Sequence, residues 1–100
     1  MGACDFYTES IGKDAKDAFA RAVETARYEY GHGGYTGSIA EKRDFKSVTC
    51  PAGVDPTDYA IKLVERGDPL VNDKWGPAGC VELPRKNGMR CFLFFGLASS

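Results

Sequence analysis

An amphipathic segment from Asp14 to Tyr30 constrains the fold of this chain more than any other feature. Its apolar residues recur at the three- and four-residue spacing that places side chains on one face of an α-helix. They are Ala15, Ala18, Phe19, Ala22, Val23, Ala26 and Tyr30. Asp14 is suited to cap the N-terminus, and Gly31 stands where a left-handed residue commonly ends a helix. Because alanine dominates the stripe, a bulky surface must approach closely, most simply the face of a sheet.

The segments around this helix predict strands and a second helix. Residues 3–9 alternate in polarity, as a half-buried strand does. Residues 37–49 look extended, although the charges within them suggest a bend. Asp55 is a suitable N-cap with Pro56 at the first helical position, and Gly67 ends the second helix.

The C-terminal part predicts two antiparallel strands. Residues 80–83 and 90–96 are strand-like, and Asn87-Gly88 between them is a strong hairpin signal. The expected order is therefore strand, helix, strand, helix, strand, strand. We expect residues 1–100 to form a single small α+β domain, with two helices packed on one face of a roughly four-stranded, mostly antiparallel sheet.

Composition excludes several classes of function. Thirteen basic and fourteen acidic residues give a net charge of −1, which provides no global attraction to nucleic acid or to an anionic membrane. No apolar run approaches the roughly 18 residues of a membrane span, so we expect a cytosolic protein without membrane contact. The cysteines are dispersed, without a C-x-x-C pair, so we expect reduced thiols, no metal site and no cofactor. They are Cys4, Cys50, Cys80 and Cys91.

The segment from Gly31 to Gly37 combines conformational freedom with hydrogen-bonding groups. It holds four glycines in seven positions and the only histidine of the chain. Phosphate-binding loops precede a helix, whereas this segment follows one and meets the negative end of the helix dipole. An anion-binding nest of backbone amides near Lys42 or Arg43 is the remaining phosphate-binding alternative. We expect at least one of the glycines to have a positive φ.

A purely structural interpretation explains most of these glycines. Gly31 would cap the helix, Gly33 and Gly34 would make the turn, and Gly37 would allow a close backbone approach. A turn from helix to strand does not require the polar side chains between them. The candidate binding residues are therefore Gly31, His32, Gly33, Gly34, Tyr35, Thr36, Gly37, Lys42 and Arg43.

Residues 28–42, YEYGHGGYTGSIAEK, resemble a segment found in short proteins of tailed bacteriophages. In that family a similar alanine-rich helix runs into G-H-G/S-G-Y-T-G-T-I-A-E-K. Tyr30 stands where a histidine is expected and Ser38 where a threonine is expected, and the likeness covers roughly the first half of the chain. The family carries no established catalytic residues, so no residue role transfers. The resemblance implies a virus-encoded accessory protein in the host cytoplasm, and it favours an inhibitor of host defence or of a host enzyme.

The leading hypothesis is a binding protein rather than an enzyme. Its loop at residues 31–37 would contact a host protein or sequester a small nucleotide, since tyrosine and glycine suit such surfaces. The alternative is a small nuclease or nucleotide-processing enzyme, with His32 as general acid or base assisted by Tyr35, Glu41 or Lys42.

Two further interpretations concern the residues that follow the loop. Basic and aromatic residues interleave here as on a nucleic-acid stacking platform, with Lys42, Arg43 and Lys46 beside Tyr35 and Phe45. Glu41 and Asp44 interrupt that patch, so nucleic acid is not the favoured partner. The only tryptophan, Trp75, has the chemistry of an exposed recognition anchor, but we expect it to cover an edge of the core.

Overall fold

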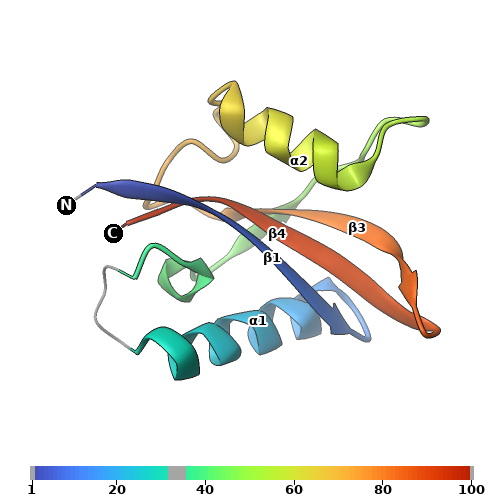
Figure 1. Ribbon diagram of the computed structural model, residues 1–100, viewed down its shortest axis with the longest axis horizontal. Helices are drawn as coiled ribbons and strands as arrows, with labels where there is room; N and C mark the ends of the chain where they lie inside the picture. Colours follow the sequence, from blue (N-terminus) through green and yellow to red (C-terminus); the bar gives the residue numbers. More distant parts are fainter. Residues whose placement is uncertain (1, 32–35, 100) are drawn as a thin grey trace.

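The computed structural model describes residues 2–31 and 36–99 and has a single sheet between two helices (Figure 1). The sheet order is β1-β4-β3-β2. The elements in chain order are β1 (Ala3–Gly12), α1 (Ala15–Tyr30), the short 3₁₀ helix η1 (Ile39–Glu41), β2 (Phe45–Ser47), α2 (Pro56–Glu65), β3 (Ala78–Lys86) and β4 (Met89–Ser99). The α+β class and the expected order of strands and helices are confirmed. Of residues 37–49, only 45–47 form a strand, because η1 and a bend at residue 43 interrupt the extended chain before them.

β4 is the central strand and organises the sheet. It pairs antiparallel with β1 over ten residues, from Ala3 opposite Ser99 to Gly12 opposite Arg90. It also pairs antiparallel with β3, whereas β2 adds three residues parallel to β3. The β3–β4 turn at 87–88 has positive φ at both residues, 54° and 80°. The Asn-Gly hairpin signal is thereby confirmed.

The two helices cover opposite faces of the sheet rather than the single face expected (Figure 1). α1 packs with the face that carries Phe92 and Phe94, and α2 packs with the face that carries Leu93 and Phe95. These four consecutive side chains are all buried. Since neighbouring residues of a strand point to opposite faces, a central strand that is apolar throughout needs a cover on each side.

Three phenylalanines join α1, β2 and β4 beneath the helix. The ring centroids of Phe19 and Phe45 are 5.1 Å apart, and each ring lies within 5.6 Å of Phe94. The predicted alanine stripe of α1 is buried beside them at Ala18 and Ala22, which confirms the close approach of a sheet. Tyr30 was placed on the same stripe, but it is exposed because the helix ends there.

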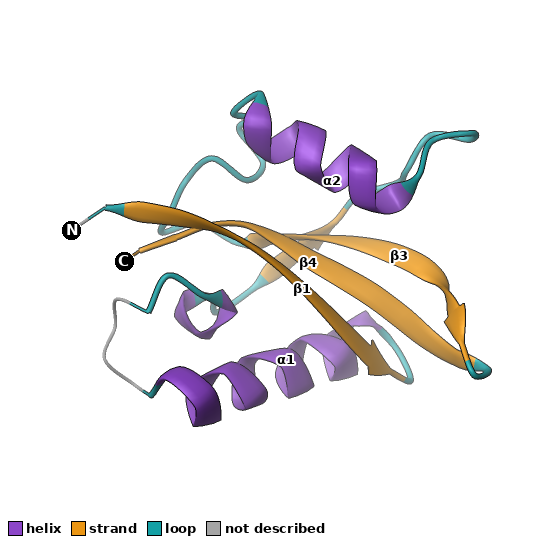
Figure 2. Cartoon of the chain, viewed as in Figure 1, coloured by secondary structure: helices purple, strands orange, loops and turns teal. Residues whose placement is uncertain are grey.

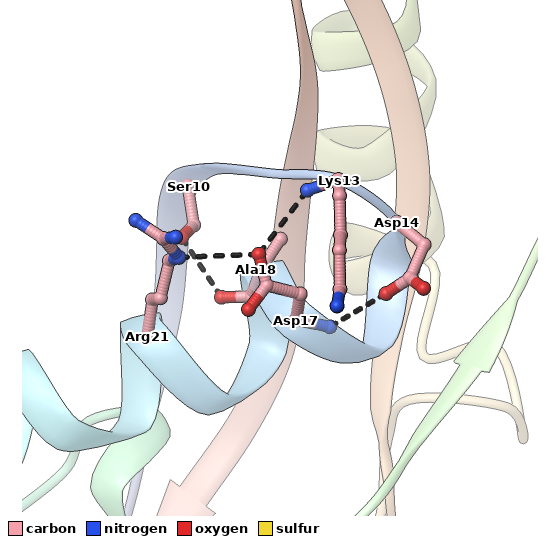
Figure 3. A network of polar contacts seen from close by, with 6 residues as sticks. All are labelled: Ser10, Lys13, Asp14, Asp17, Ala18 and Arg21. Atoms are coloured by element: carbon pink, nitrogen blue, oxygen red, sulfur yellow. Dashed lines mark hydrogen bonds and ion pairs between the residues drawn. The ribbon is translucent and has the colours of Figure 1, made fainter.

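The start of α1 is held by two interlocked aspartates (Figure 3). The Asp14 carboxylate accepts the Asp17 backbone N–H at 2.8 Å, as expected of the N-cap. The Asp17 carboxylate accepts the Lys13 backbone N–H at 3.1 Å and the Arg21 Nε at 3.2 Å. These bonds, the Lys13 amide first, lower the pKa of Asp17. The turn from β1 into α1 is therefore closed by local polar contacts.

Within the described residues, no helix has both the length and the apolar character to cross a membrane. All four cysteines have free thiols, and Cys80 and Cys91 are buried. Burial raises the pKa of the Cys80 thiol to about 11. Cys80 is therefore a core residue in its neutral form.

Candidate functional site

The described ends of the glycine-rich segment have the backbone geometry expected from the sequence. Gly31 has φ 84° and donates its N–H to the Arg27 carbonyl at 2.9 Å, which ends α1. Gly37 has φ 68° and donates to the Ser99 carbonyl at 2.8 Å, which ties the segment to the end of β4. The prediction of positive φ in this segment is thereby confirmed. Four predicted site residues lie outside the described part of the chain: His32, Gly33, Gly34 and Tyr35.

Thr36 closes the turn that leads into η1. Its hydroxyl donates to the Glu41 carboxylate at 2.7 Å, and its backbone N–H reaches the same oxygen at 3.2 Å. Its hydroxyl oxygen also lies 2.8 Å from that of Ser38, the N-cap of η1. Thr36 and Glu41 are therefore engaged with each other, and together they order the chain after the glycine-rich segment.

Lys42 is a buried lysine with its ammonium fully hydrogen-bonded. Only 2% of the residue is exposed, and Nζ donates to the carbonyl oxygens of Gly76 at 2.8 Å, Asp73 at 3.3 Å and Lys74 at 3.3 Å. An ammonium has three donors, so all of them are used. Burial lowers the pKa of Lys42, and the nearby Asp73 carboxylate opposes that shift. Lys42 is thus a positioning residue that fastens the turn at residues 73–76 to the end of η1.

That turn presents Trp75 to the solvent. Trp75 is 68% exposed, so the expectation that it covers an edge of the core is wrong. Its backbone N–H donates to the Asp73 carboxylate at 2.9 Å, and the Lys74 ammonium lies 5.4 Å from the centroid of its ring. The carbonyls on either side of Trp75 are held by Lys42, so the backbone is fixed while the side chain points outward.

Trp75 borders a depression of about 640 Å³ between the end of α1, the η1–β2 connection and the turn before β3. Its lining includes Gly31, Lys42 and Arg43 from the predicted site. A second depression, of about 890 Å³, runs along α1 and shares Arg27, Lys42 and Arg43 with the first. We call four of the exposed side chains around these depressions the Trp75 surface: Arg27, Tyr28, Arg43 and Trp75.

The Trp75 surface has the composition of a protein-binding site. Tyr28 is 92% exposed, and among the described residues neither Arg27 nor Arg43 forms an ion pair. Tryptophan, tyrosine and arginine are the residue types most enriched among those that dominate interface energies. Glu41 and Asp44 line the same depression, so its charge is mixed. The surface can therefore form both apolar and charge-assisted contacts.

The structure brings together only part of the predicted site. Gly31, Lys42 and Arg43 share the first depression, whereas Thr36 and Gly37 line a third one on the β1 side of α1. Sequence reasoning missed Arg27 and Tyr28, although both stand off the apolar stripe of α1 near the glycine-rich segment. A tyrosine on the polar face of a helix was the signal that could have drawn attention to them.

Metal-binding chemistry is not supported by the part of the chain at residues 2–31 and 36–99. No three His, Cys, Asp or Glu side chains there are grouped closely enough to hold an ion.

Comparisons with protein-family models, curated proteins and solved structures found no match.

Proposed function

We propose that this protein is an accessory binding protein of the kind that tailed bacteriophages encode. It would act in the host cytoplasm by occupying a surface of a host defence protein or host enzyme, without catalysing a reaction. The observation that carries the proposal is the exposure of Trp75 beside Arg43 and Arg27, next to the glycine-rich segment. The sequence resemblance at residues 28–42 supports the viral origin.

The fixed backbone under Trp75 favours binding. Ordering a mobile anchor on association costs free energy, and an anchor that is already held avoids part of that cost. The three bonds from Lys42 hold the turn before any partner arrives. Burial of the indole on binding then contributes apolar area without a large loss of backbone entropy.

Sequestration of a small nucleotide is the second candidate. The first depression, of about 640 Å³, lies within the range of about 300–1,000 Å³ that small-molecule sites occupy. Trp75 offers a ring on which a base can stack, and Arg27 and Arg43 offer guanidinium groups for phosphate. The negative charges of Glu41 and Asp44, which line the same depression, oppose an anionic ligand, and this candidate is therefore second.

The test is an affinity purification after chemical cross-linking in bacterial host cells, with captured proteins and small molecules identified by mass spectrometry. Wild type, Trp75→Ala and Arg43→Glu are compared with Met89→Ala, which changes an exposed apolar residue in the β3–β4 hairpin. We expect one host protein to be retained by wild type and Met89→Ala and lost from the two surface variants.

Two other results would count against the first candidate. A nucleotide that copurifies with wild type and disappears with Trp75→Ala, without any protein, would support sequestration instead. Equal capture by all four proteins would remove the Trp75 surface from the function.

A further inference from the structure

The outer edge of β1 is long and open. β1 lies at one end of the sheet order and pairs with β4 over ten residues, whereas the opposite edge strand, β2, has only three (Figure 2). Among residues 2–31 and 36–99, no backbone hydrogen bond from outside the sheet reaches β1. In an edge strand, alternate residues direct their N–H and C=O groups away from the sheet. β1 therefore presents a row of unpaired backbone donors and acceptors.

β1 lacks most of the devices that protect a sheet edge. Proteins block edges with charged side chains, especially lysine, and with proline, a bulge or a very short strand. The charged residues of β1, Asp5 and Glu9, are acidic, so they disfavour pairing with an acidic strand but not with a cationic one. Residues 3–12 include no lysine and no proline, and their pairing with β4 is unbroken. By contrast, β3 carries a register shift between Leu83 and Lys86. The edge of β1 is thus competent to pair with a further strand.

The third depression described above runs as a groove beside this edge, on the α1 face of the sheet. It has a volume of about 490 Å³ and lies between β1 residues 5–10 and α1. Phe6, Ala22 and Ala26 line it and are each no more than 7% exposed, so part of its lining is buried and apolar. Arg21, Glu29 and several serines and threonines also line it. When an extended peptide adds to a sheet edge, every second side chain enters such a groove and provides specificity.

The other face of β1 is acidic. Asp5, Tyr7 and Glu9 alternate along the strand and are all exposed. The pKa of Tyr7 is raised, first by partial burial and then by the negative charges of Asp5 and Glu65. Opposite charges on neighbouring strands attract, so this face favours cationic side chains on an added strand.

We propose that the edge of β1 binds an extended segment of another protein that carries lysine or arginine at alternate positions, as an added strand of the sheet. This site is separate from the Trp75 surface and does not depend on it. A second copy of the chain is the weaker occupant, because residues 3–12 contain no cation and self-pairing would gather Asp5 and Glu9 of both copies. Backbone hydrogen bonds to β1 provide affinity. The groove binds the small apolar side chains of the added segment, and the acidic face of β1 binds its lysine or arginine side chains.

The test uses a synthetic peptide as long as β1 that alternates lysine and valine. Binding is measured by fluorescence anisotropy, and hydrogen exchange of the β1 amides is followed by NMR. We expect the outward-facing β1 amides to become protected when the peptide is added. Glu9→Lys should weaken binding about five- to tenfold, because it places like charges on adjacent strands, whereas Glu24→Lys on the far side of α1 should change it less than about twofold.

Control peptides separate strand addition from simple charge attraction. The same peptide, methylated on the alternate backbone nitrogens that would face β1, keeps its charge but loses the donors that pair with the strand, so it should not bind. The proposal would be overturned if the methylated peptide bound as tightly as the unmethylated one. It would also be overturned if Glu9→Lys and Glu24→Lys bound the unmethylated peptide equally well. Protection of β1 that rises with protein concentration in the absence of peptide would also overturn it, because the second copy would then be the occupant.

Discussion

The ammonium of Lys42 lies 2.8 Å from the carbonyl oxygen of Gly76 and links two parts of the chain that are 34 residues apart. One end of this contact follows η1, and the other forms the turn that exposes Trp75. The same ammonium donates to the carbonyls of Asp73 and Lys74. The position of the only tryptophan is therefore set by a buried lysine rather than by packing of the indole.

Lys42→Met should loosen the Trp75 turn. The methionine fills the space of the aliphatic chain but leaves three carbonyls without their donor, which we expect to cost about 1–3 kcal/mol of unfolding free energy. Because Trp75 is the only tryptophan, its fluorescence anisotropy should fall in the variant. Lys46→Met, at an exposed position, is the matched control for loss of a positive charge. Unchanged anisotropy and stability in Lys42→Met would mean that the turn does not depend on this ammonium.

Trp75→Ala should separate binding from stability. The side chain is largely exposed, so we expect the free energy of unfolding to change by less than about 1 kcal/mol while partner binding is lost. Phe94→Ala, at a fully buried position, should instead cost about 3–5 kcal/mol. Urea unfolding and the cross-linking purification, performed on the same protein samples, check both statements. If Trp75→Ala unfolds as readily as Phe94→Ala, the tryptophan is structural.

Gly79→Ala should destabilise the α2 side of the core. A Cβ at Gly79 would lie 2.5 Å from Cζ of Phe95 and 3.0 Å from Cγ1 of Val71. These contacts are too short, so we expect a loss of about 1–3 kcal/mol, as for other overpacked cores. A Phe95→Leu change in the same chain removes the ring, and the double variant should lose less stability than the sum of the single changes. Strict additivity in urea unfolding would show that the ring is not the obstacle.

The stability of the protein should decrease in acid because of Asp17. Its pKa is lowered below the ordinary 3.8 by the Lys13 amide and by Arg21. A carboxylate with a lowered folded-state pKa stabilises the fold above its unfolded pKa, and that contribution is lost as the pH falls through the folded-state value. Urea unfolding at successive pH values below 3.8 should show this loss in wild type and a smaller one in Asp17→Asn. Identical pH profiles would contradict the assignment.

The sequence determined the elements whose signals are local. Asp14 and Gly31 delimit α1 because capping bonds join residues three or four positions apart, and Asn87-Gly88 sets the hairpin through its own backbone preference. The alanines of α1 likewise predicted the close approach of a sheet. Each of these inferences needed only neighbouring residues.

Only the tertiary structure decided which faces the helices cover and which side chains form the candidate site. The uninterrupted apolar run at residues 91–98 calls for a cover on each face of the strand, but it does not specify which helix lies on which face. Lys42 is polar and Trp75 apolar, yet Lys42 is buried and Trp75 is exposed. The burial of Lys42 depends on carbonyl oxygens more than 30 residues away in the chain, because a buried charge is tolerated only where it has hydrogen-bond partners. The turn that provides these carbonyls is the one that exposes Trp75.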